Sequence, residues 1–324
     1  MSLKGYIIKR TIYNLFILYI VATLNFAIFR LMPGDPVRAA VIGDPRASLY
    51  RDELIKLWGL DKPLWDQYWI YISTIFRGEF GISFVSGAPV AKEIMDRLPN
   101  TLLLMGTSTL LSLVLGIATG IVAAHHRGKK GDVAVVTASL TVYSFPIFWI
   151  GMLFLLVFSF YLGWFPLGGT ITSLDVVRQG YIPFVMDVLW HLALPVIALT
   201  IYGYGGLTLI VRNTLIDVLT EDYILTARAK GLDDRTVLYK HALKNAMLPL
   251  VTIIALSLAG CVGGAIITET IFSWYGIGKF TFDALMNLDY PVLQALFFIE
   301  SALVIAANFV ADILYGFLDP RVRY

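Results

Sequence analysis

Long apolar runs constrain this 324-residue chain more than any other feature of its sequence. About 20 apolar residues cross the roughly 30 Å hydrocarbon core of a bilayer, and backbone groups there must pair within their own segment, so each run has to form a helix. We expect an all-α polytopic membrane protein with six transmembrane helices. Their approximate bounds are 9–31, 100–124, 133–162, 187–211, 247–271 and 292–317.

The composition points the same way. Hydrophobic residues make up 58% of the chain and charged residues only 15%, against roughly a quarter charged in soluble domains. The single cysteine, Cys261, rules out an intrachain disulfide, and the four histidines lack metalloprotease spacing, so we expect no metal site. No nucleophile, base and orienting group form a catalytic pattern, so we expect no catalytic residue. The first apolar run is too long for a signal peptide and indicates a retained span.

Lysine and arginine near the span ends predict the orientation. The segments 163–186 and 273–291 carry one basic residue each, and 32–99 is too long for its charges to steer insertion. These three segments are therefore expected outside the cell. The other flanks are basic, through Lys4, Lys9, Arg10, Arg127, Lys129, Lys130, Arg321 and Arg323. We expect a multi-pass protein of the cell membrane with both termini in the cytoplasm.

The segment 32–99 reads as an external helical insertion. "DPRASLYRDELIKLWGL" (44–60) and "PLWDQYWIYISTIF" (63–76) place apolar residues at helical spacing and predict short amphipathic helices over the outer mouth. Gly78, Gly81 and Gly87 are expected to mark turns. Asn100–Thr101 and Asp132 are the expected N-caps of the second and third spans.

A compact charged block, "EDYILTARAKGLDDRTVLYKHALKN" (221–245), lies inside the expected cytoplasmic loop 213–246. "DYILTARAK" can form a short helix that Gly231 ends, and Asp233 or Asp234 can cap a second helix that runs toward Pro249. A solvated positive-inside loop is the alternative. Mixed charge with small residues at helical spacing instead favours an element that docks into a groove of a partner.

Several stretches carry a family resemblance. "TARAKG" followed by "KHALKNAMLP" resembles the cytoplasmic coupling loop of binding-protein-dependent ABC importer permeases. Other stretches are similar to the B-type permease subunit of the dipeptide/oligopeptide branch. They are "FRLMPGDP" (29–36), "GLDKPLWDQYWIYI" (59–72), "RGEFGISF" (77–84), "RLPNTLLL" (97–104), "SFPIFWIGMLF" (144–154), "ETIFSWYGIGKF" (269–280) and "ADILYGFLDPRVRY" (311–324).

The resemblance implies a type I ABC importer permease fold, with residues 1–324 as one transmembrane domain. It implies a peptide importer in which this chain forms the solute pathway with a second permease. Two cytosolic ATPases would hold ATP and Mg, a periplasmic or extracellular binding protein would deliver solute, and membrane lipid would surround the spans; nucleic acid has no role. The same machinery also carries oligosaccharides or nickel. A secondary transporter driven by an ion gradient is a more distant alternative.

The resemblance also assigns the ATPase-coupling residues. The family consensus has a Glu-Ala-Ala triplet where this chain has Leu225, Thr226 and Ala227, and a Gly that Gly231 matches. The consensus Glu and the later Pro are both missing, so individual contacts do not carry over. The expected coupling residues are Thr226, Ala227, Arg228, Ala229, Lys230, Gly231, Leu232, Asp233, His241 and Asn245.

Small and acidic residues in the last two spans are candidates for the translocation path or a subunit interface. Gly260 and Gly264 have the spacing that lets helices approach closely, either within one subunit or against a partner. Glu300 stands well inside the sixth span, where it is expected to pair with a neighbouring helix or to face the path, because an isolated carboxylate is costly there. Glu269, near the outer end of the fifth span, favours a structural role. "GIGKF" (276–280) lacks the first glycine and the hydroxyl of a phosphate loop, so we expect no nucleotide site in this chain.

Overall fold

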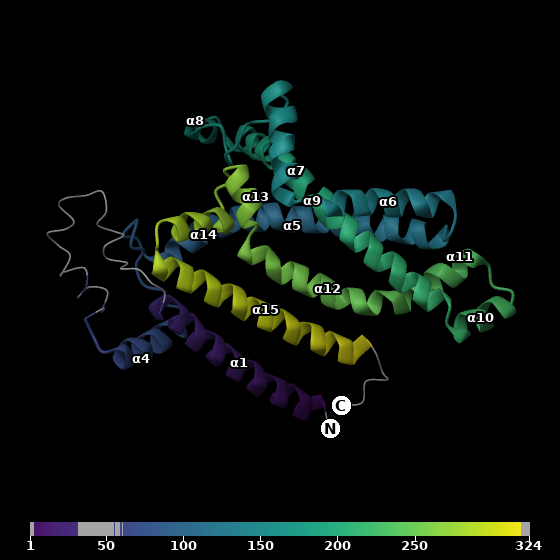
Figure 1. Cartoon of the computed structure of the whole chain (residues 1–324), viewed down its shortest axis with the longest axis horizontal. Coiled ribbons are helices and arrows are strands. Elements are labelled where there is room, and N and C mark those ends of the chain that lie inside the picture. Colours follow the sequence, from purple (N-terminus) through teal and green to yellow (C-terminus); the bar gives the residue numbers. More distant parts are fainter. Residues whose placement is uncertain (1–2, 32–54, 56–58, 60, 319–324) are drawn as a thin grey trace.

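The computed structural model describes residues 3–31, 55, 59 and 61–318. Helices make up most of this part of the chain, and its one isolated β-bridge joins Ile82 to Pro89. Figure 1 labels the helices. Their bounds are α1 (Leu3–Leu31), α4 (Leu64–Ile75), α5 (Val90–His125), α6 (Lys130–Ser144), α7 (Ile147–Phe154), the π-helix η2 (Leu155–Tyr161), α8 (Leu174–Arg178), α9 (Tyr181–Leu219), α10 (Asp222–Ala229), α11 (Asp234–Thr236), the π-helix η3 (Val237–Ala242), α12 (Leu243–Gly263), α13 (Ile266–Ile271), α14 (Ile277–Met286) and α15 (Tyr290–Leu318).

Four helices are each long and apolar enough to cross a bilayer, namely α1, α5, α9 and α15. A fifth crossing is possible if α6 and the α7–η2 helix together count as one span. Helix α12 has 21 residues, and at 1.5 Å per residue it is about 30 Å long, close to the hydrocarbon thickness. The all-α polytopic fold is confirmed, and six spans are compatible with these helices.

Four of the expected spans have clearly different bounds in the structure, and the fourth is longer than expected because α9 runs from Tyr181 to Leu219. The second begins at Val90 and carries Pro99 inside it, so Asn100–Thr101 is not an N-cap. The third bends by 90° between α6 and α7, where Phe145 is extended because it precedes Pro146. The fifth ends as α12 at Gly264, whose φ is +76°.

The centre of the bundle is the close pair α5 and α9. A Cβ on Gly116 would lie 2.7 Å from Cβ of Leu207, and one on Gly120 would lie 2.6 Å from Cβ of Val211. Atoms do not approach this closely without displacement, so only glycine allows the two backbones to lie at this distance. Here the small residues of the second span serve helix packing inside one subunit.

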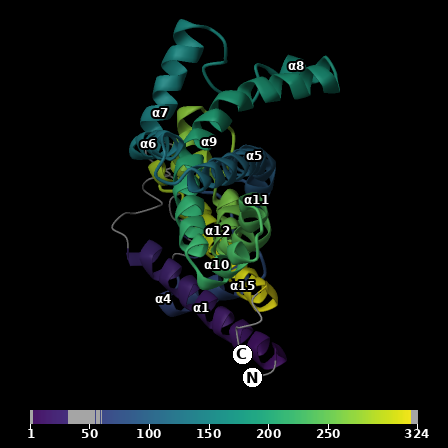
Figure 2. The ribbon, with the colours of Figure 1, turned by 90° about the vertical axis from the view of Figure 1, so that its right-hand side faces the viewer.

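The helix ends sort into two groups along the long axis of Figure 1. Helices α10 and α11, the α5–α6 turn and the Leu3 end of α1 lie at one end, and α4, α14 and the Tyr290 end of α15 lie at the other. Helices α1 and α15 run side by side and in contact. Figure 2 shows α7 and α8 extending away from this bundle.

The expected helix over residues 63–76 is confirmed as α4. The turns at Gly78, Gly81 and Gly87 are confirmed by their positive φ angles. The helix expected over residues 44–60 lies outside the described residues, apart from single positions.

Candidate coupling surface and translocation-path residues

The charged block folds as a helical hairpin that interrupts the bundle between α9 and α12. Helix α10 ends at Ala229 with Lys230 as its C-cap, and Gly231 follows with φ of +80°, a left-handed conformation that ends the helix as expected. Asp233 then caps α11 by accepting a hydrogen bond of 3.2 Å from the backbone N–H of Thr236. The side chain and backbone of Thr236 hold the pKa of Asp233 below its ordinary value. The second helix is longer than expected, because α11, η3 and α12 are continuous.

Buried apolar side chains seat this hairpin on the bundle. Ile224 and Ala227 of α10 are 0% and 6% exposed and share one cluster with Val237 and Leu238 of η3. The cluster continues into the ends of α5, α9 and α12, through Ala124, Val211, Leu215, Ile216, Ala242, Ala246 and Leu250. The block is therefore a packed element, and the solvated-loop alternative does not describe it.

Polar contacts join the two arms of the hairpin. Asn245 donates a 2.6 Å hydrogen bond from Nδ2 to the hydroxyl of Tyr223. That hydroxyl lies 3.4 Å from the carbonyl of His241, to which it donates. His241 and Asn245, both expected in the coupling group, thus brace the hairpin from within the chain.

The opposite side of the hairpin is open. Seven of the expected coupling residues are exposed, namely Thr226, Arg228, Ala229, Lys230, Gly231, Leu232 and Asp233, whereas Ala227 is buried. Arg228 and Asp234 form a weak surface ion pair at 3.8 Å. Two apolar side chains that sequence reasoning missed, Leu225 and Tyr239, are 56% and 51% exposed.

An ion pair connects α6 to the part of α9 that leads into the hairpin. Nε and Nη2 of Arg212 donate to Oδ1 and Oδ2 of Asp132 at 2.6 and 2.8 Å, and the backbone N–H of Gly128 donates to Oδ2 at 2.9 Å. Asp132 was expected to be an N-cap, but Lys129 holds that position and Asp132 lies in the first turn of α6. Its carboxylate binds a helix 80 residues away instead.

At the other end, Glu269 is fully buried in a chain of hydrogen bonds. The backbone N–H of Ile277 donates to the hydroxyl of Thr101 at 2.7 Å, which leaves that hydroxyl to donate to Oε1 of Glu269 at 3.1 Å. The backbone N–H of Lys279 donates to Oε2 at 3.0 Å. A Cβ on Gly276 would collide with this carboxylate. Glu269 therefore fastens the α13–α14 hairpin to α5.

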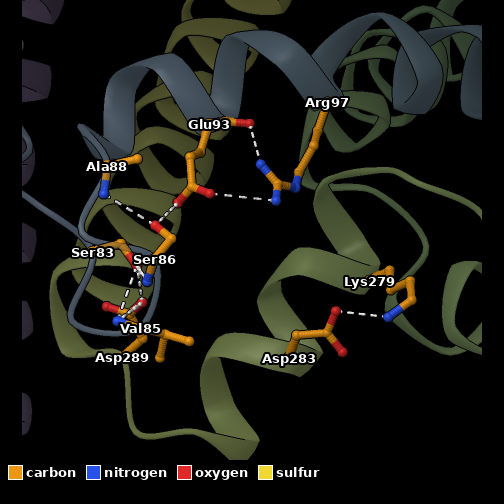
Figure 3. A network of polar contacts seen from close by, with 9 residues as sticks. All are labelled: Ser83, Val85, Ser86, Ala88, Glu93, Arg97, Lys279, Asp283 and Asp289. Carbon is orange, nitrogen blue, oxygen red and sulfur yellow. Dashed lines mark hydrogen bonds and ion pairs between the residues drawn. The ribbon is translucent and has the colours of Figure 1, made fainter. Parts of the chain in front are cut away.

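Figure 3 shows a second polar network at this end. Asp289 is 2% exposed and accepts from the hydroxyl of Ser83 at 2.5 Å and from the backbone N–H of Phe84 at 3.0 Å. Ser86 donates to Oε2 of Glu93 at 3.1 Å. These contacts fix the loop before α5 against the turn that begins α15.

Glu300 and Gly260 are the two path candidates with open surroundings. No hydrogen bond or ion pair of Glu300 occurs among residues 3–31, 55, 59 and 61–318, and its side chain is exposed. It lies beside the end of α12, where a Cβ on Gly263 would be 2.8 Å from its Oε1. A Cβ on Gly260 would have no neighbour within 4 Å among the residues that the structure describes, whereas one on Gly264 would lie 2.7 Å from the backbone N of Gly278. Gly264 thus packs inside this chain, and Gly260 has room for a neighbour.

Comparisons with known proteins agree with this architecture. Residues 116–324 match the family model described as binding-protein-dependent transport system inner membrane component. Residues 3–105 match the model for the N-terminal part of binding-protein-dependent transport system membrane components.

Curated relatives match over nearly the whole chain. The oligopeptide transport system permease protein AppB of Bacillus subtilis strain 168 is 40% identical, over 99% of this chain and 100% of its own length. The di/tripeptide transport system permease protein DppB of Pseudomonas aeruginosa strain UCBPP-PA14 is 39% identical over 94% of each chain. The glutathione transport system permease protein GsiC of Escherichia coli strain K12 is 39% identical over 99% of each.

A solved structure supports the fold. A chain of the MetNI methionine ABC transporter in an inward-facing conformation superposes with a TM-score of 0.52 at 16% identity. The superposition covers 70% of this chain and 96% of that one.

Proposed function

Because the chain belongs to the family of binding-protein-dependent transport system inner membrane components, we propose that it is the permease subunit of an ATP-driven ABC importer for peptides. The names of three relatives specify oligopeptides, di- and tripeptides, and glutathione, which is itself a small peptide. They support a peptide cargo over the oligosaccharide and nickel alternatives. A carrier driven by an ion gradient has no support from these relatives.

The observation that carries the coupling role is the hairpin of α10, Gly231 and η3. Its inner side is held by buried Ile224 and Val237, and its outer side presents Leu225, Arg228 and neighbouring small residues. A helix that is fixed on one side and open on the other can transmit a displacement from a partner to the bundle. We infer that a cytosolic ATPase docks here, with ATP and Mg²⁺ on that subunit, and that a second ATPase docks on the second permease.

The remaining assembly follows from the two ends of the molecule. The hairpin end faces the cytoplasm in this proposal, so both termini lie there and the α4–α14 end faces a periplasmic or extracellular solute-binding protein. The second permease completes the pathway, with Gly260 and Glu300 as the candidates that face it or the solute. An exposed carboxylate in a span is costly against lipid, which favours a wet path or a partner helix around Glu300.

The proposed cycle needs no covalent chemistry in this chain. ATP binding closes the ATPase pair, the hairpins follow, and the spans move from an inward- to an outward-facing arrangement. Solute released by the binding protein enters the pathway, and ATP hydrolysis resets it. Solute contacts along the pathway are expected to be weak, because a path that binds tightly does not release.

Copurification tests the proposal directly. The detergent-solubilised chain is expressed with its genomic neighbours as wild type, Gly231→Asn and Gly231→Arg, and copurifying proteins are identified by mass spectrometry. Asparagine tolerates the left-handed conformation and adds little bulk, whereas arginine adds a long side chain to the open face. We expect ATPases and a second permease with wild type and Gly231→Asn, and loss of the ATPases alone with Gly231→Arg. Recovery of wild type without any ATPase would refute the importer assignment.

A further inference from the structure

A cavity of about 390 Å³ lies at the α4 end of the molecule, apart from the hairpin and from the path candidates. Helix α4, the end of α1, the loop before α5 and the first turn of α15 form its walls. This volume is within the range of small-molecule binding sites. Its polar lining includes Arg30, Lys62, Glu79 and Tyr290.

The walls of the cavity are fixed by hydrogen bonds from one residue of α1. Asn25 is 6% exposed, and its Nδ2 donates to the backbone carbonyl of Gln294 at 2.8 Å and to the hydroxyl of Tyr71 at 3.1 Å. This amide thereby links α1 to α15 and to α4. Thr23 and Tyr68 add a hydroxyl–hydroxyl contact of 2.9 Å between α1 and α4. The cavity is therefore built into the packing of three helices.

Two polar atoms that line this cavity are buried without a hydrogen-bond partner in the part of the chain that the structure describes. Tyr290 is 6% exposed, and neither its hydroxyl nor Nε of Arg30 has a partner among residues 3–31, 55, 59 and 61–318. An unpaired buried donor loses its hydrogen bond to water without a replacement, so proteins rarely retain one without a reason. Both groups donate hydrogen bonds, and the charged lining has two basic side chains against the single acidic Glu79. These donors suit an anionic group with several acceptor oxygens.

The surface beside the cavity indicates where this anion comes from. Helix α4 leaves Trp65 and Trp69 exposed at 66% and 48%. Ile70, 43% exposed, belongs both to this apolar surface and to the cavity wall. Exposed tryptophans at the end of a transmembrane bundle are typical of the membrane–water interface, at the depth of lipid headgroups. A lipid can place its headgroup in the cavity and its acyl chains along this apolar surface.

We propose that this cavity binds the phosphate of an anionic phospholipid, with Arg30 and Tyr290 as hydrogen-bond donors and Lys62 as a further positive charge. The occupied site ties α1 and α4 to α15 through the ligand. The site does not depend on the identity of the transported solute. Its assignment to the outer leaflet rests on the orientation given in the proposed function.

Lipid retention by the intact transporter tests this site. The complex is purified as wild type, Arg30→Gln, Tyr290→Phe and Arg178→Gln. Arg178→Gln is the matched control, because this arginine lies outside the cavity, is 83% exposed and forms a surface ion pair with Asp175. Phosphatidylglycerol and phosphatidylcholine with the same acyl chains are added, and bound lipid is measured by native mass spectrometry and by the shift in Tm. We expect wild type to retain phosphatidylglycerol selectively. Retention should fall about fivefold in the Arg30 and Tyr290 variants, because each loses one hydrogen bond to the lipid, and it should be unchanged in the Arg178 control.

Tyr290→Phe separates ligand binding from folding. Without anionic lipid this variant should keep or raise the Tm of wild type, because it removes only an unpaired hydroxyl. With phosphatidylglycerol it should lose most of the protection that wild type gains. Two further arms contain inorganic phosphate or a tripeptide with a free carboxylate. Equal phosphatidylglycerol binding by wild type and both variants would overturn the proposal, as would equal protection of wild type by either soluble anion.

Discussion

Arg212 and Asp132 form a bidentate ion pair, with both oxygens of the carboxylate within 2.8 Å of guanidinium nitrogens, and the pair joins α9 to the start of α6. The side chains are only 22% and 6% exposed, so the pair is largely shielded from water. Helix α9 leads into the hairpin, and α6 begins the bent span. The ion pair therefore lies where a displacement of the hairpin would reach a second helix.

Breaking this pair should destabilise the chain by about 3 kcal/mol, since removal of one partner leaves a shielded charge uncompensated. Arg212→Ala and Asp132→Ala are each expected to lower the Tm strongly. The double variant should lose much less stability than the sum of the losses of the two single variants. Thermal unfolding of all three in one detergent gives the interaction energy of this cycle. The control is the surface pair Arg178–Asp175, whose side chains are 83% and 75% exposed. It should show no measurable interaction energy. Additive losses at Arg212 and Asp132 would mean that the pair is not coupled.

The two faces of α10 should respond differently to truncation. Ile224→Ala removes a fully buried side chain and is expected to cost about 2–4 kcal/mol in stability. Its neighbour Leu225 is 56% exposed, so Leu225→Ala should leave the Tm unchanged. Leu225→Ala should instead weaken ATPase copurification, which a titration of salt-washed membranes with purified ATPase measures. If Leu225→Ala binds ATPase as wild type does, the docking face lies elsewhere on the hairpin.

In the described structure the side-chain carboxylate of Glu269 acts only as a hydrogen-bond acceptor. Its donors are the hydroxyl of Thr101 and the backbone N–H groups of Ala265 and Lys279. Glu269→Gln would point an N–H₂ group at backbone donors and should destabilise the α13–α14 hairpin by about 1–3 kcal/mol. Thr101→Val should act similarly because it removes the hydroxyl between Ile277 and Glu269, while Thr101→Ser keeps that hydroxyl and should be mild. Protease accessibility of the hairpin reports the effect. An equal response to valine and serine at residue 101 would contradict the hydrogen-bond chain.

Local sequence pattern was sufficient to predict the hairpin. The turn after α10 needs a positive φ angle at residue 231, which glycine adopts without strain. Asp233 is an ordinary N-capping residue for the helix that follows. The exposed positions of Leu225 and Tyr239 were less predictable. Both are apolar residues of short helices that pack on the bundle, where an apolar side chain is ordinarily expected on the buried face.

The bends in the spans could not be predicted from hydropathy, which measures how apolar a segment is and carries no direction. Pro99 and Pro146 show the difficulty, because the first stays inside a helix and the second begins one. Helix α5 continues through Pro99 since Ile94 and Val90, about one and a half and two and a half turns before it, are buried in a core cluster with α14 and α15. Thr101 finds its carboxylate partner 168 residues away, a contact that no local pattern encodes.

Gly260 is the position where an interface with a second permease can be separated from packing inside this chain. Gly278→Ala places a Cβ 2.7 Å from the backbone N of Ile266 and should destabilise the chain by itself. A Cβ at Gly260 has no neighbour within 4 Å among the described residues, and leucine is a better helix former than glycine by roughly 0.5–1 kcal/mol, so Gly260→Leu should leave the Tm of the isolated chain the same or raise it. If Gly260 faces the second permease, the added side chain should block close approach of the two helices and reduce copurification of that subunit. A drop in Tm of the isolated chain as large as that of Gly278→Ala would instead place Gly260 in internal packing, and normal copurification at unchanged Tm would remove it from the interface.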